Sequence, residues 1–272
     1  MTAEAPGPQG QHARLQAYLN QNPRVAIAFS GGVDSSYLLY AAKIAGCDAR
    51  AYLIKTRFQP QFEIADAKRL AETLAIPLTI GELDVLSYRD IAQNPPDRCY
   101  HCKTAIITKL WELVREDGID VLCDGTNADD DETDRPGMRA LRENGVVSPL
   151  RACGLRKDDI RRLSKQAGLS THDKPAYACL ATRIPTGTTI TGTLLEAIEH
   201  AENVLFDMGF TDFRVRVIPD KQDDNSAVAE TRFIARIQVR ASQWDAAASQ
   251  RSEILAALRP GFSGTVLDME TR

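Results

Sequence analysis

A short apolar run that stops at two glycines constrains the fold of this chain more than any other feature. Residues 24–29 read RVAIAF, and the loop SGGVDSS follows at 30–36. An apolar run of this length that ends at a glycine-rich turn predicts a buried strand. The sequence SSYLLYAAKIAG then predicts a helix that ends at Gly46. A strand, a tight loop and a helix in this order begin a βαβ unit.

The same alternation continues through the first half of the chain. Strands are predicted at 49–56, 77–83 and 119–126, and helices at 62–76 and 99–116. Strands that alternate with helices predict right-handed βαβ units and a parallel sheet that is covered on both faces. Ligands of such sheets bind at the carboxyl ends of the strands, where both SGG and DGTN lie.

The pattern changes after about residue 190 and predicts a second, smaller domain. Helices are predicted at 191–210 and 244–258, and strands at 213–218, 233–239 and 264–269. The Thr/Pro/Gly-rich residues 175–191 are expected to connect the two domains, and the polar residues 220–230 to form a hairpin tip. The predicted fold class is therefore α/β, with a doubly wound parallel-sheet domain and a smaller C-terminal α/β domain.

Composition excludes several classes of protein. The 272 residues carry a formal net charge of −4 and no basic block, so nothing indicates binding to a long nucleic acid. No apolar run reaches membrane-spanning length, so no membrane partner is expected. The polar, Pro/Gly-rich residues 1–11 predict a disordered lead-in and no signal peptide. We therefore expect a cytoplasmic protein whose six cysteines are reduced thiols, metal ligands or catalysts.

The glycine-rich loop has the properties of a phosphate-binding loop. Its glycines allow positive φ and close approach of a ligand, while the N–H groups of the following helix start point at one spot. The aspartate of the loop would cap the helix or hold Mg²⁺. The alternative is a strand-to-helix turn that is merely rich in small residues. The residues of the loop are Ser30, Gly31, Gly32, Val33, Asp34, Ser35 and Ser36.

This loop has neither the Lys-Ser/Thr of a Walker A motif nor the GxGxxG of a dinucleotide site. SGGVDSS instead matches the PP-loop signature, and the sequence resembles the N-type ATP pyrophosphatases. That resemblance implies that ATP and Mg²⁺ bind, that ATP is cut between its α- and β-phosphates, and that the substrate is transiently adenylated.

Two cysteines lie one helical turn apart in the sequence CYHCKTAI. Cys99 and Cys102 are so spaced that both thiols can face one point, as zinc ligands, iron–sulfur ligands, a redox pair or inert neighbours. His101 between them is expected to point away. Cys179 in the connector is a candidate third ligand, with Cys153 as its competitor, and three thiolates would suit a [4Fe–4S] cluster with one open iron. Cys47 and Cys123 are expected to be inert, Cys123 as a small core residue.

Four stretches together resemble one family. They read SGGVDSS, PDRCYHCK, DGTNADDDETDRPGMRALRENGVVSPL and DKPAYACLATRIPTGTTIT, and FRVRV joins them later. They are similar to the LarE sulfur transferases, which help to build a nickel-pincer cofactor. The resemblance implies a PP-loop domain of the adenine nucleotide α-hydrolase-like fold at residues 12–190. It also implies a C-terminal domain for substrate binding and oligomerisation at residues 191–272.

LarE proteins adenylate a carboxylate of pyridinium-3,5-biscarboxylic acid mononucleotide and convert it to a thiocarboxylate. One variant of the family has only the cysteine that matches Cys179, which surrenders its own sulfur. The other holds a [4Fe–4S] cluster with an extra sulfide, and this sequence resembles it at Cys99, Cys102 and Cys179. The expected partners are therefore this pyridinium mononucleotide, a sulfide source and further copies of the chain.

The resemblance also implies roles for individual residues. Lys103 and Arg183, each next to or near a matching cysteine, would neutralise charge on the α-phosphate. Arg214 and Arg216 alternate along a strand and would grip the phosphate or carboxylates of the substrate, unless they form a solvated strand face. Further matching positions are Gly125 and Thr126 in the nucleotide pocket and Glu202, which is either part of the substrate site or a surface residue.

The sequence departs from the family pattern at two places, and other enzymes stay open. The stretch of chain after Asp220 is longer and more polar than the family pattern predicts. At the C-terminal end, an arginine that would bind the substrate phosphate is either missing or is Arg272. The acidic residues Asp129, Asp130, Asp131 and Asp134 are expected to be mostly solvated. The alternatives are a tRNA thiolase, against which the acidic balance speaks, an ammonia-using ligase, and a zinc-stapled nucleotide sensor.

Overall fold

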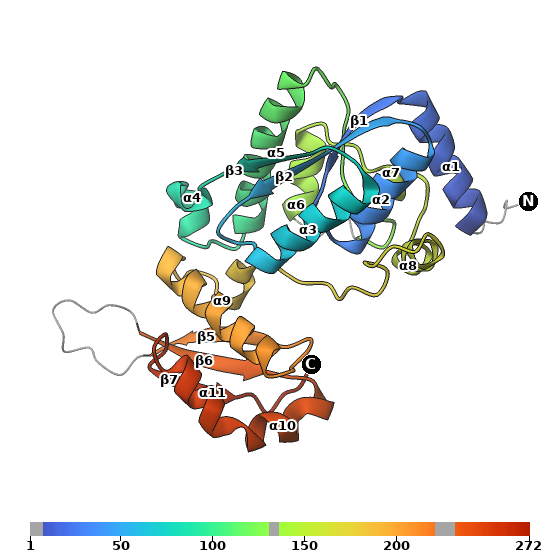
Figure 1. Cartoon of the computed structure of the whole chain (residues 1–272). Helices are drawn as coiled ribbons and strands as arrows, with labels where there is room; N and C mark the ends of the chain where they lie inside the picture. Colours follow the sequence, from blue (N-terminus) through green and yellow to red (C-terminus); the bar gives the residue numbers. More distant parts are fainter. Residues whose placement is uncertain (1–7, 131–135, 221–231) are drawn as a thin grey trace, which may run out of the picture. The chain divides into compact units, whose positions relative to one another are not determined.

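A computed structural model of the 272-residue chain describes residues 8–130, 136–220 and 232–272 (Figure 1). The described chain divides into two compact units. The first unit reaches to Val85 and also contains Asp97–Ala176, and the second consists of Leu86–Pro96 and Tyr177–Arg272. The expected hairpin tip beyond Asp220 and the acidic residues Asp131 and Asp134 lie outside the described residues.

The first unit is built on the predicted parallel sheet. Its strands are β1 (Arg24–Ala28), β2 (Asp48–Lys55), β3 (Leu78–Glu82) and β4 (Leu122–Cys123), in the order β3-β2-β1-β4. Every pairing in this sheet is parallel. The fourth strand is shorter than the predicted 119–126, because beyond Cys123 the N–H of Asp124 bonds to the carbonyl of Val147 at 2.9 Å.

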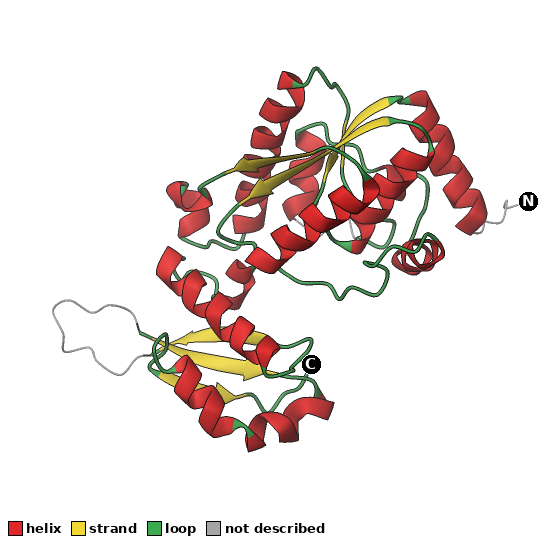
Figure 2. Cartoon of the chain, in the orientation of Figure 1, coloured by secondary structure: helices red, strands yellow, loops and turns green. Residues whose placement is uncertain are grey.

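Helices cover both faces of this sheet, as the alternation predicted (Figure 2). Along β1, Val25 and Ile27 pack into one hydrophobic core while Ala26 packs into another. The first core is closed by α1 (Pro8–Gln21), α2 (Val33–Ile44), α3 (Gln61–Leu74), α7 (Pro149–Ala152) and α8 (Lys157–Gln166). The second is closed by α5 (Arg98–Glu116) and α6 (Pro136–Glu143). Because α1 begins at Pro8, the end of the segment expected to be disordered is helical.

The second unit contains a three-stranded sheet and its own helices. Strand β5 (Arg214–Pro219) pairs antiparallel with β6 (Phe233–Gln238), which pairs parallel with β7 (Gly264–Leu267). The helices are α4 (Arg89–Ala92), α9 (Gly192–Asp207), α10 (Trp244–Ser249) and α11 (Arg251–Leu258). Short 3₁₀ turns span Val85–Ser87, Leu180–Arg183 and Ala241–Gln243. The single helix predicted at 244–258 is two helices, because Gln250 between them has φ −89° and ψ 12°.

From Tyr177 onward, the connector belongs to the second unit, where it is bound to Leu86–Pro96. The N–H of Gly187 donates to the carbonyl of Asn94 at 2.8 Å, and the Asn94 side chain donates to the carbonyl of Pro185 at 2.9 Å. The N–H of Ile190 donates to the carbonyl of Ala92 at 2.7 Å. Across the described parts of both units, no helix has the length and apolar character needed to span a lipid bilayer.

Candidate active site

A cavity of about 380 Å³ lies at the carboxyl ends of β1 and β4. In the strand order β3-β2-β1-β4, the chain connects to opposite sides of the sheet after β1 and β4, so this is the topological switch point at which such sheets bind ligands. The cavity is lined by residues from the loops after both strands and from α5. Those among them that the sequence predicted are Ser30, Gly32, Asp34, Ser35, Lys103, Gly125 and Thr126.

The loop after β1 has the shape that its glycines predict. Gly31 has φ +71°, and a Cβ atom there would lie 3.1 Å from the Cβ of Ala67. The N-cap of α2 is Gly32, whose N–H donates to the hydroxyl of Ser30 at 3.3 Å, and glycine has no side chain to cap the N–H groups that follow. The first N–H groups of α2 are thus open to an anion from the cavity, beside the positive end of the helix dipole.

Two residues of the loop serve the fold. Val33 is only 4% exposed and packs in the first core. Ser36 is fully buried, and its hydroxyl donates to the carbonyl of Gly32 at 2.7 Å. The hydroxyl of Ser36 is therefore used within the loop, and this bond holds the loop closed. The hydroxyls of Ser30 and Ser35 lie 3.1 Å from each other at the cavity.

Asp34 is ion-paired to a lysine that sequence reasoning missed. Lys157 Nζ lies 2.6 Å from Asp34 Oδ2, so Asp34 is not the helix cap that one prediction made it. Burial raises the pKa of Asp34, and the Lys157 ammonium opposes this shift. Asp34 Oδ1 is buried and has no hydrogen bond within 3.5 Å from the described residues, although the Asn127 side chain is near enough to lower the pKa of Asp34. A carboxylate oxygen left open beside a phosphate loop fits a ligand of Mg²⁺.

The loop after β4 is fixed against the loop after β1. Asp124 accepts hydrogen bonds from Thr126 Oγ1 at 2.5 Å and from Ser148 Oγ at 2.6 Å. A Cβ atom on Gly125 would lie 2.7 Å from the backbone nitrogen of Ser35, so only glycine fits there. The position of Asp124 at a predicted strand end was a signal that could have marked it. Lys157 gave none, because it is far from Asp34 in the sequence.

Helix α5 carries Lys103 and the cysteine pair. Lys103 lines the cavity, and its Cδ lies 3.2 Å from where a Cβ on Gly137 would be. Cys99 is exposed, and its Sγ accepts a hydrogen bond from Arg98 Nη2 at 3.5 Å. Cys102 is half-buried. A cation beside a thiolate suits a metal-ligating cysteine, because it offsets the thiolate charge.

The other candidate residues of the first unit have structural roles. His101 pairs with Asp97 at 3.1 Å. Cys47 donates to the carbonyl of Leu19 at 3.2 Å, and Cys153 lies in the first core, which removes it as the competing third ligand. Cys123 is fully buried as predicted, and burial raises its pKa to about 12. Among residues 8–130, 136–220 and 232–272, no three His, Cys, Asp or Glu side chains group as metal ligands.

Asp129 is exposed, as expected, whereas Asp130 is half-buried and lines the cavity, and both hold backbone groups in place. Asp129 Oδ2 accepts from the N–H of Lys157 at 2.8 Å. Asp130 Oδ2 accepts from the N–H of Asn127 at 3.0 Å, and the Asp130 carbonyl accepts from Arg151 Nη1 at 2.5 Å. These bonds fix the loop after β4 to the start of α8, where Lys157 lies.

In the second unit, Arg183 and Glu202 form a buried ion pair. Arg183 Nε lies 2.8 Å from Glu202 Oε1, and the two side chains are 1% and 2% exposed. Glu202 is therefore not the surface residue that one prediction allowed. Arg183, expected to neutralise a phosphate, has its guanidinium fixed on this carboxylate instead. Half-buried Cys179 immediately precedes the turn Leu180–Arg183 that ends in Arg183.

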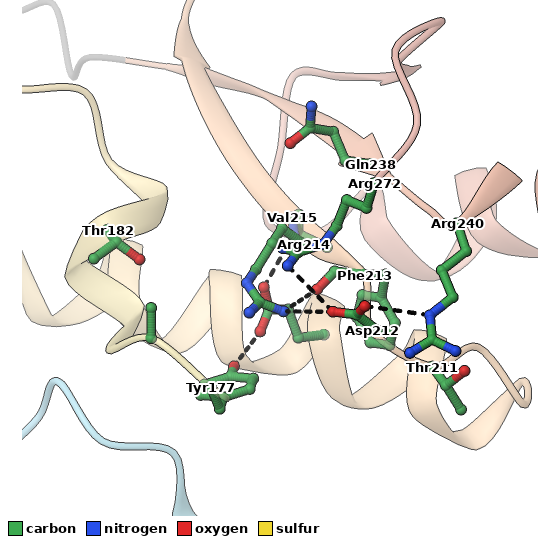
Figure 3. A network of polar contacts seen from close by, with 12 residues as sticks. Tyr177, Thr182, Thr211, Asp212, Phe213, Arg214, Val215, Gln238, Arg240 and Arg272 are labelled. Carbon is green, nitrogen blue, oxygen red and sulfur yellow. Dashed lines mark hydrogen bonds and ion pairs between the residues drawn. The ribbon is translucent and has the colours of Figure 1, made fainter. Parts of the chain in front are cut away.

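Arginines gather on one face of β5 and around it, in the polar network that Figure 3 shows. Arg214 is 6% exposed and donates to the Phe213 carbonyl at 2.6 Å, so it is not part of a solvated face. Burial lowers the pKa of Arg214 and of Arg216, and the neighbouring guanidinium of Arg183 lowers both further. Arg272 pairs with Asp212 at 3.2 Å. A cluster of guanidiniums such as this favours the binding of an anion.

Comparison with known proteins gives the family. No protein-family model matches the chain. A pyridinium-3,5-bisthiocarboxylic acid mononucleotide synthase of Lactiplantibacillus plantarum is 34% identical over 206 residues, which cover 75% of each chain. The chain belongs to the LarE family. An uncharacterized protein of Synechocystis is also similar to this LarE-family chain, with 33% identity over 203 residues, 74% of this chain and 76% of the other.

The LarE-family chain has more distant relatives among the tRNA-modifying enzymes. A tRNA-specific 2-thiouridylase, MnmA, of Pseudothermotoga lettingae is 28% identical over 187 residues, 56% of this chain and 54% of its own length. The names of both characterised relatives denote enzymes whose products contain sulfur. The predicted LarE resemblance is thus confirmed at the level of the family.

Proposed function

We propose that this chain is an ATP-dependent sulfur transferase that makes a thiocarboxylate from pyridinium-3,5-biscarboxylic acid mononucleotide. The observation that carries the proposal is the 34% identity to the Lactiplantibacillus synthase over three quarters of both chains. The cavity at the switch point supports it, because its open helix start, its carboxylate and its lysine suit a nucleoside triphosphate with Mg²⁺.

The first step is adenylation of the substrate. A carboxylate oxygen of the substrate attacks the α-phosphorus of ATP, the bond to the β-phosphate oxygen breaks, and pyrophosphate leaves. The loop at 30–36 would hold the departing phosphates on the N–H groups of α2, and Asp34 would hold Mg²⁺. Lys103 would offset charge that develops on the α-phosphate.

The second step replaces AMP with sulfur. We assign Cys99, Cys102 and Cys179 as the thiolates that hold a [4Fe–4S] cluster, which when bound would supply a sulfide as nucleophile. The carbon–sulfur bond forms as the bond between the carboxyl carbon and the AMP oxygen breaks, so that AMP and a thiocarboxylate leave. Arg214 and Arg216 would bind the substrate phosphate, because they are buried or half-buried cations crowded by other cations.

The test measures pyrophosphate released by the protein prepared without oxygen. We expect release to depend on the pyridinium mononucleotide and not on tRNA or ammonia. Iron and acid-labile sulfide should fall in Cys99→Ala, Cys102→Ala and Cys179→Ala but remain in the control Cys47→Ala, whose thiol bonds to the Leu19 carbonyl. Equal iron in all four variants would end the cluster assignment.

A tRNA thiolase is the second candidate, favoured by the 28% identity to MnmA over 56% of this chain. Pyrophosphate release that requires tRNA, together with sulfur found in the tRNA, would support this candidate and overturn the first.

A further inference from the structure

The segment that carries Cys179 is bound on both sides to a single buried carboxylate. Before Cys179, the hydroxyl of Tyr177 donates to Glu202 Oε2. After it, Arg183 donates to Glu202 Oε1 at 2.8 Å and to Oε2 at 3.1 Å. Glu202 lies on α9, so one helix residue fixes both ends of the segment 177–183.

The backbone around Cys179 is held by the same residues. Arg183 Nη1 donates to the carbonyl of Ala178 at 3.0 Å. The backbone N–H and the hydroxyl of Thr182 both donate to the carbonyl of Cys179, at 3.0 and 2.8 Å. The peptide groups on either side of the Cys179 side chain are thus both fixed, which limits where its sulfur can lie.

Glu202 itself is immobilised by the sheet. It is 1% exposed, and its Oε1 also accepts from the backbone N–H of Val215 on β5 at 3.0 Å. The Tyr177 ring lies between two guanidiniums, 4.8 Å from Arg183 and 5.2 Å from Arg214. A buried charged network that is satisfied in this way is rigid. It connects the sheet, α9 and the cysteine segment into one body.

We infer that Glu202 and Arg183 are positioning residues that set the place and exposure of the Cys179 sulfur, and that neither contacts nucleotide or substrate. The inference rests on the proposed function for its purpose, because a thiolate that holds a sulfide-supplying cluster must itself be kept in a fixed place. Arg216 joins the same body, since its Nη1 donates to the carbonyl of Thr182 at 3.0 Å. An arginine proposed to bind substrate thereby bonds directly to the cysteine segment.

The test measures how fast each cysteine of the full-length, iron-free protein reacts with iodoacetamide, by mass spectrometry of every cysteine peptide. The variants are Glu202→Gln and Tyr177→Phe. Tyr177→Phe removes only one hydroxyl, so it keeps the test informative where Glu202→Gln fails to fold with Arg183 left unpaired. Tyr18→Phe is the matched control, because its hydroxyl bonds to Cys123 in the other unit.

We expect Cys179 to react about fivefold faster in Tyr177→Phe, the factor that matches loss of one hydrogen bond. Buried Cys123 and Cys153 should keep their rates, which shows that the fold is intact. An unchanged Cys179 rate in a folded variant would overturn the inference. Equal acceleration at all cysteines in Tyr177→Phe would also overturn it, because it would show a merely structural role.

Failure of the proposed function is a separate outcome. If the wild type releases no substrate-dependent pyrophosphate while Cys179 alone becomes faster in the variants, the proposed reaction is wrong and the positioning role stands. If pyrophosphate is released as proposed and neither substitution changes the rate at which Cys179 reacts with iodoacetamide, the positioning role is wrong and the proposed reaction stands.

Discussion

Buried Glu202 and half-buried Asp34 have opposite environments. Glu202 accepts hydrogen bonds from Tyr177, from Arg183 and from a backbone N–H, so both of its oxygens are satisfied. In Asp34, Oδ2 forms an ion pair with Lys157, while the buried Oδ1 has no hydrogen bond within 3.5 Å from the described residues. A buried polar atom without a partner costs stability and is rare in folded proteins. Glu202 therefore holds the fold together, whereas Asp34 is the carboxylate that we propose as a ligand of Mg²⁺.

Substitution of Asp34 should change how stability depends on pH. Burial raises the pKa of Asp34, so the folded state binds this proton more tightly than the unfolded state does. Ionising Asp34 in the folded state costs free energy and so lowers the stability of the wild type. This cost is absent below the pKa that Asp34 has in the unfolded chain, and it grows as pH rises through the pKa that Asp34 has in the folded protein. For nucleotide-free protein, the melting temperature of Asp34→Asn minus that of wild type should therefore increase from about pH 4 to about pH 7.

The measurement is thermal unfolding across this pH range, with Asp120→Asn at an exposed position as the matched control. Between about pH 4 and about pH 7, the melting-temperature difference from the wild type should change less for the control than for Asp34→Asn. The prediction would be contradicted if the melting temperature of Asp34→Asn minus that of the wild type fell as pH rises. The same variant should lose ATP-dependent pyrophosphate release, since Asp34 would no longer hold Mg²⁺.

Gly125 should not tolerate even a methyl group. A Cβ atom there would meet the backbone of Ser35 at 2.7 and 3.0 Å, and backbone cannot move as a flexible side chain can. Gly125→Ala should lower the free energy of unfolding by on the order of 1–3 kcal/mol and weaken ATP binding. In the control Gly264→Ala, the nearest atom is 3.6 Å away and the change should stay within about 0.5 kcal/mol. Equal stability of the two variants in chemical denaturation would refute this account.

At the scale of elements, β5 connects the proposed anion site to the segment 177–183 that carries Cys179. Alternate residues of a strand point to one face, which places Arg214 and Arg216 together. Arg214 stacks on Tyr177, and Arg216 bonds to both Gln238 and the Thr182 carbonyl. An anion on these arginines would relieve their mutual repulsion and strengthen their hold on residues 177–183.

Phosphate should therefore slow the reaction of Cys179 with iodoacetamide. At about 10 mM inorganic phosphate we expect the wild-type rate to fall about twofold or more, and chloride of equal ionic strength to leave it unchanged. Arg216→Ala should abolish the effect, whereas the exposed Arg251→Ala should retain it. Slowing by phosphate that persists in Arg216→Ala would show that the anion acts elsewhere.

Local patterns could predict strands β1, β2 and β3 and helices α2, α3 and α5, because each has a clear period and a clear end, whereas α1, α6, α7 and α8 were not predicted. Val25, Ala26 and Ile27 alternate between two cores, and the apolar run around them marks a strand buried on both faces. Residues 244–258 were misread as one helix, because no proline or glycine marks the break at Gln250. Lys157 and the burial of Glu202 depend on partners distant in sequence, which no local pattern reveals.

At the scale of the whole molecule, the charge is acidic while one strand face is basic. The chain has 33 Lys and Arg against 37 Asp and Glu. The arginines of the second unit are partly paired with carboxylates, for instance Arg240 and Arg272, which share Asp212 at 3.2 Å each. Binding of a long polyanion requires many open cations along a surface. This charge distribution suits a small anion better than a nucleic acid.

We therefore expect no tRNA binding in gel mobility assays at about 150 mM salt. A tRNA-specific 2-thiouridylase in the same assay is the positive control. A shift of tRNA by this chain that weakens steeply as salt rises would contradict the expectation, because it would reveal a phosphate-binding surface.

The division of the chain into interleaved units also has a consequence for biosynthesis. Residues 86–96 leave the ribosome long before Tyr177, yet they complete the second unit, where Ile91 and Asn94 are 1% and 3% exposed. Until the connector emerges, the Asn94 side chain lacks the carbonyls of Ile184 and Pro185. The nascent chain must therefore carry an unfinished, partly apolar segment while residues 97–176 are translated and complete the parallel sheet of the first unit.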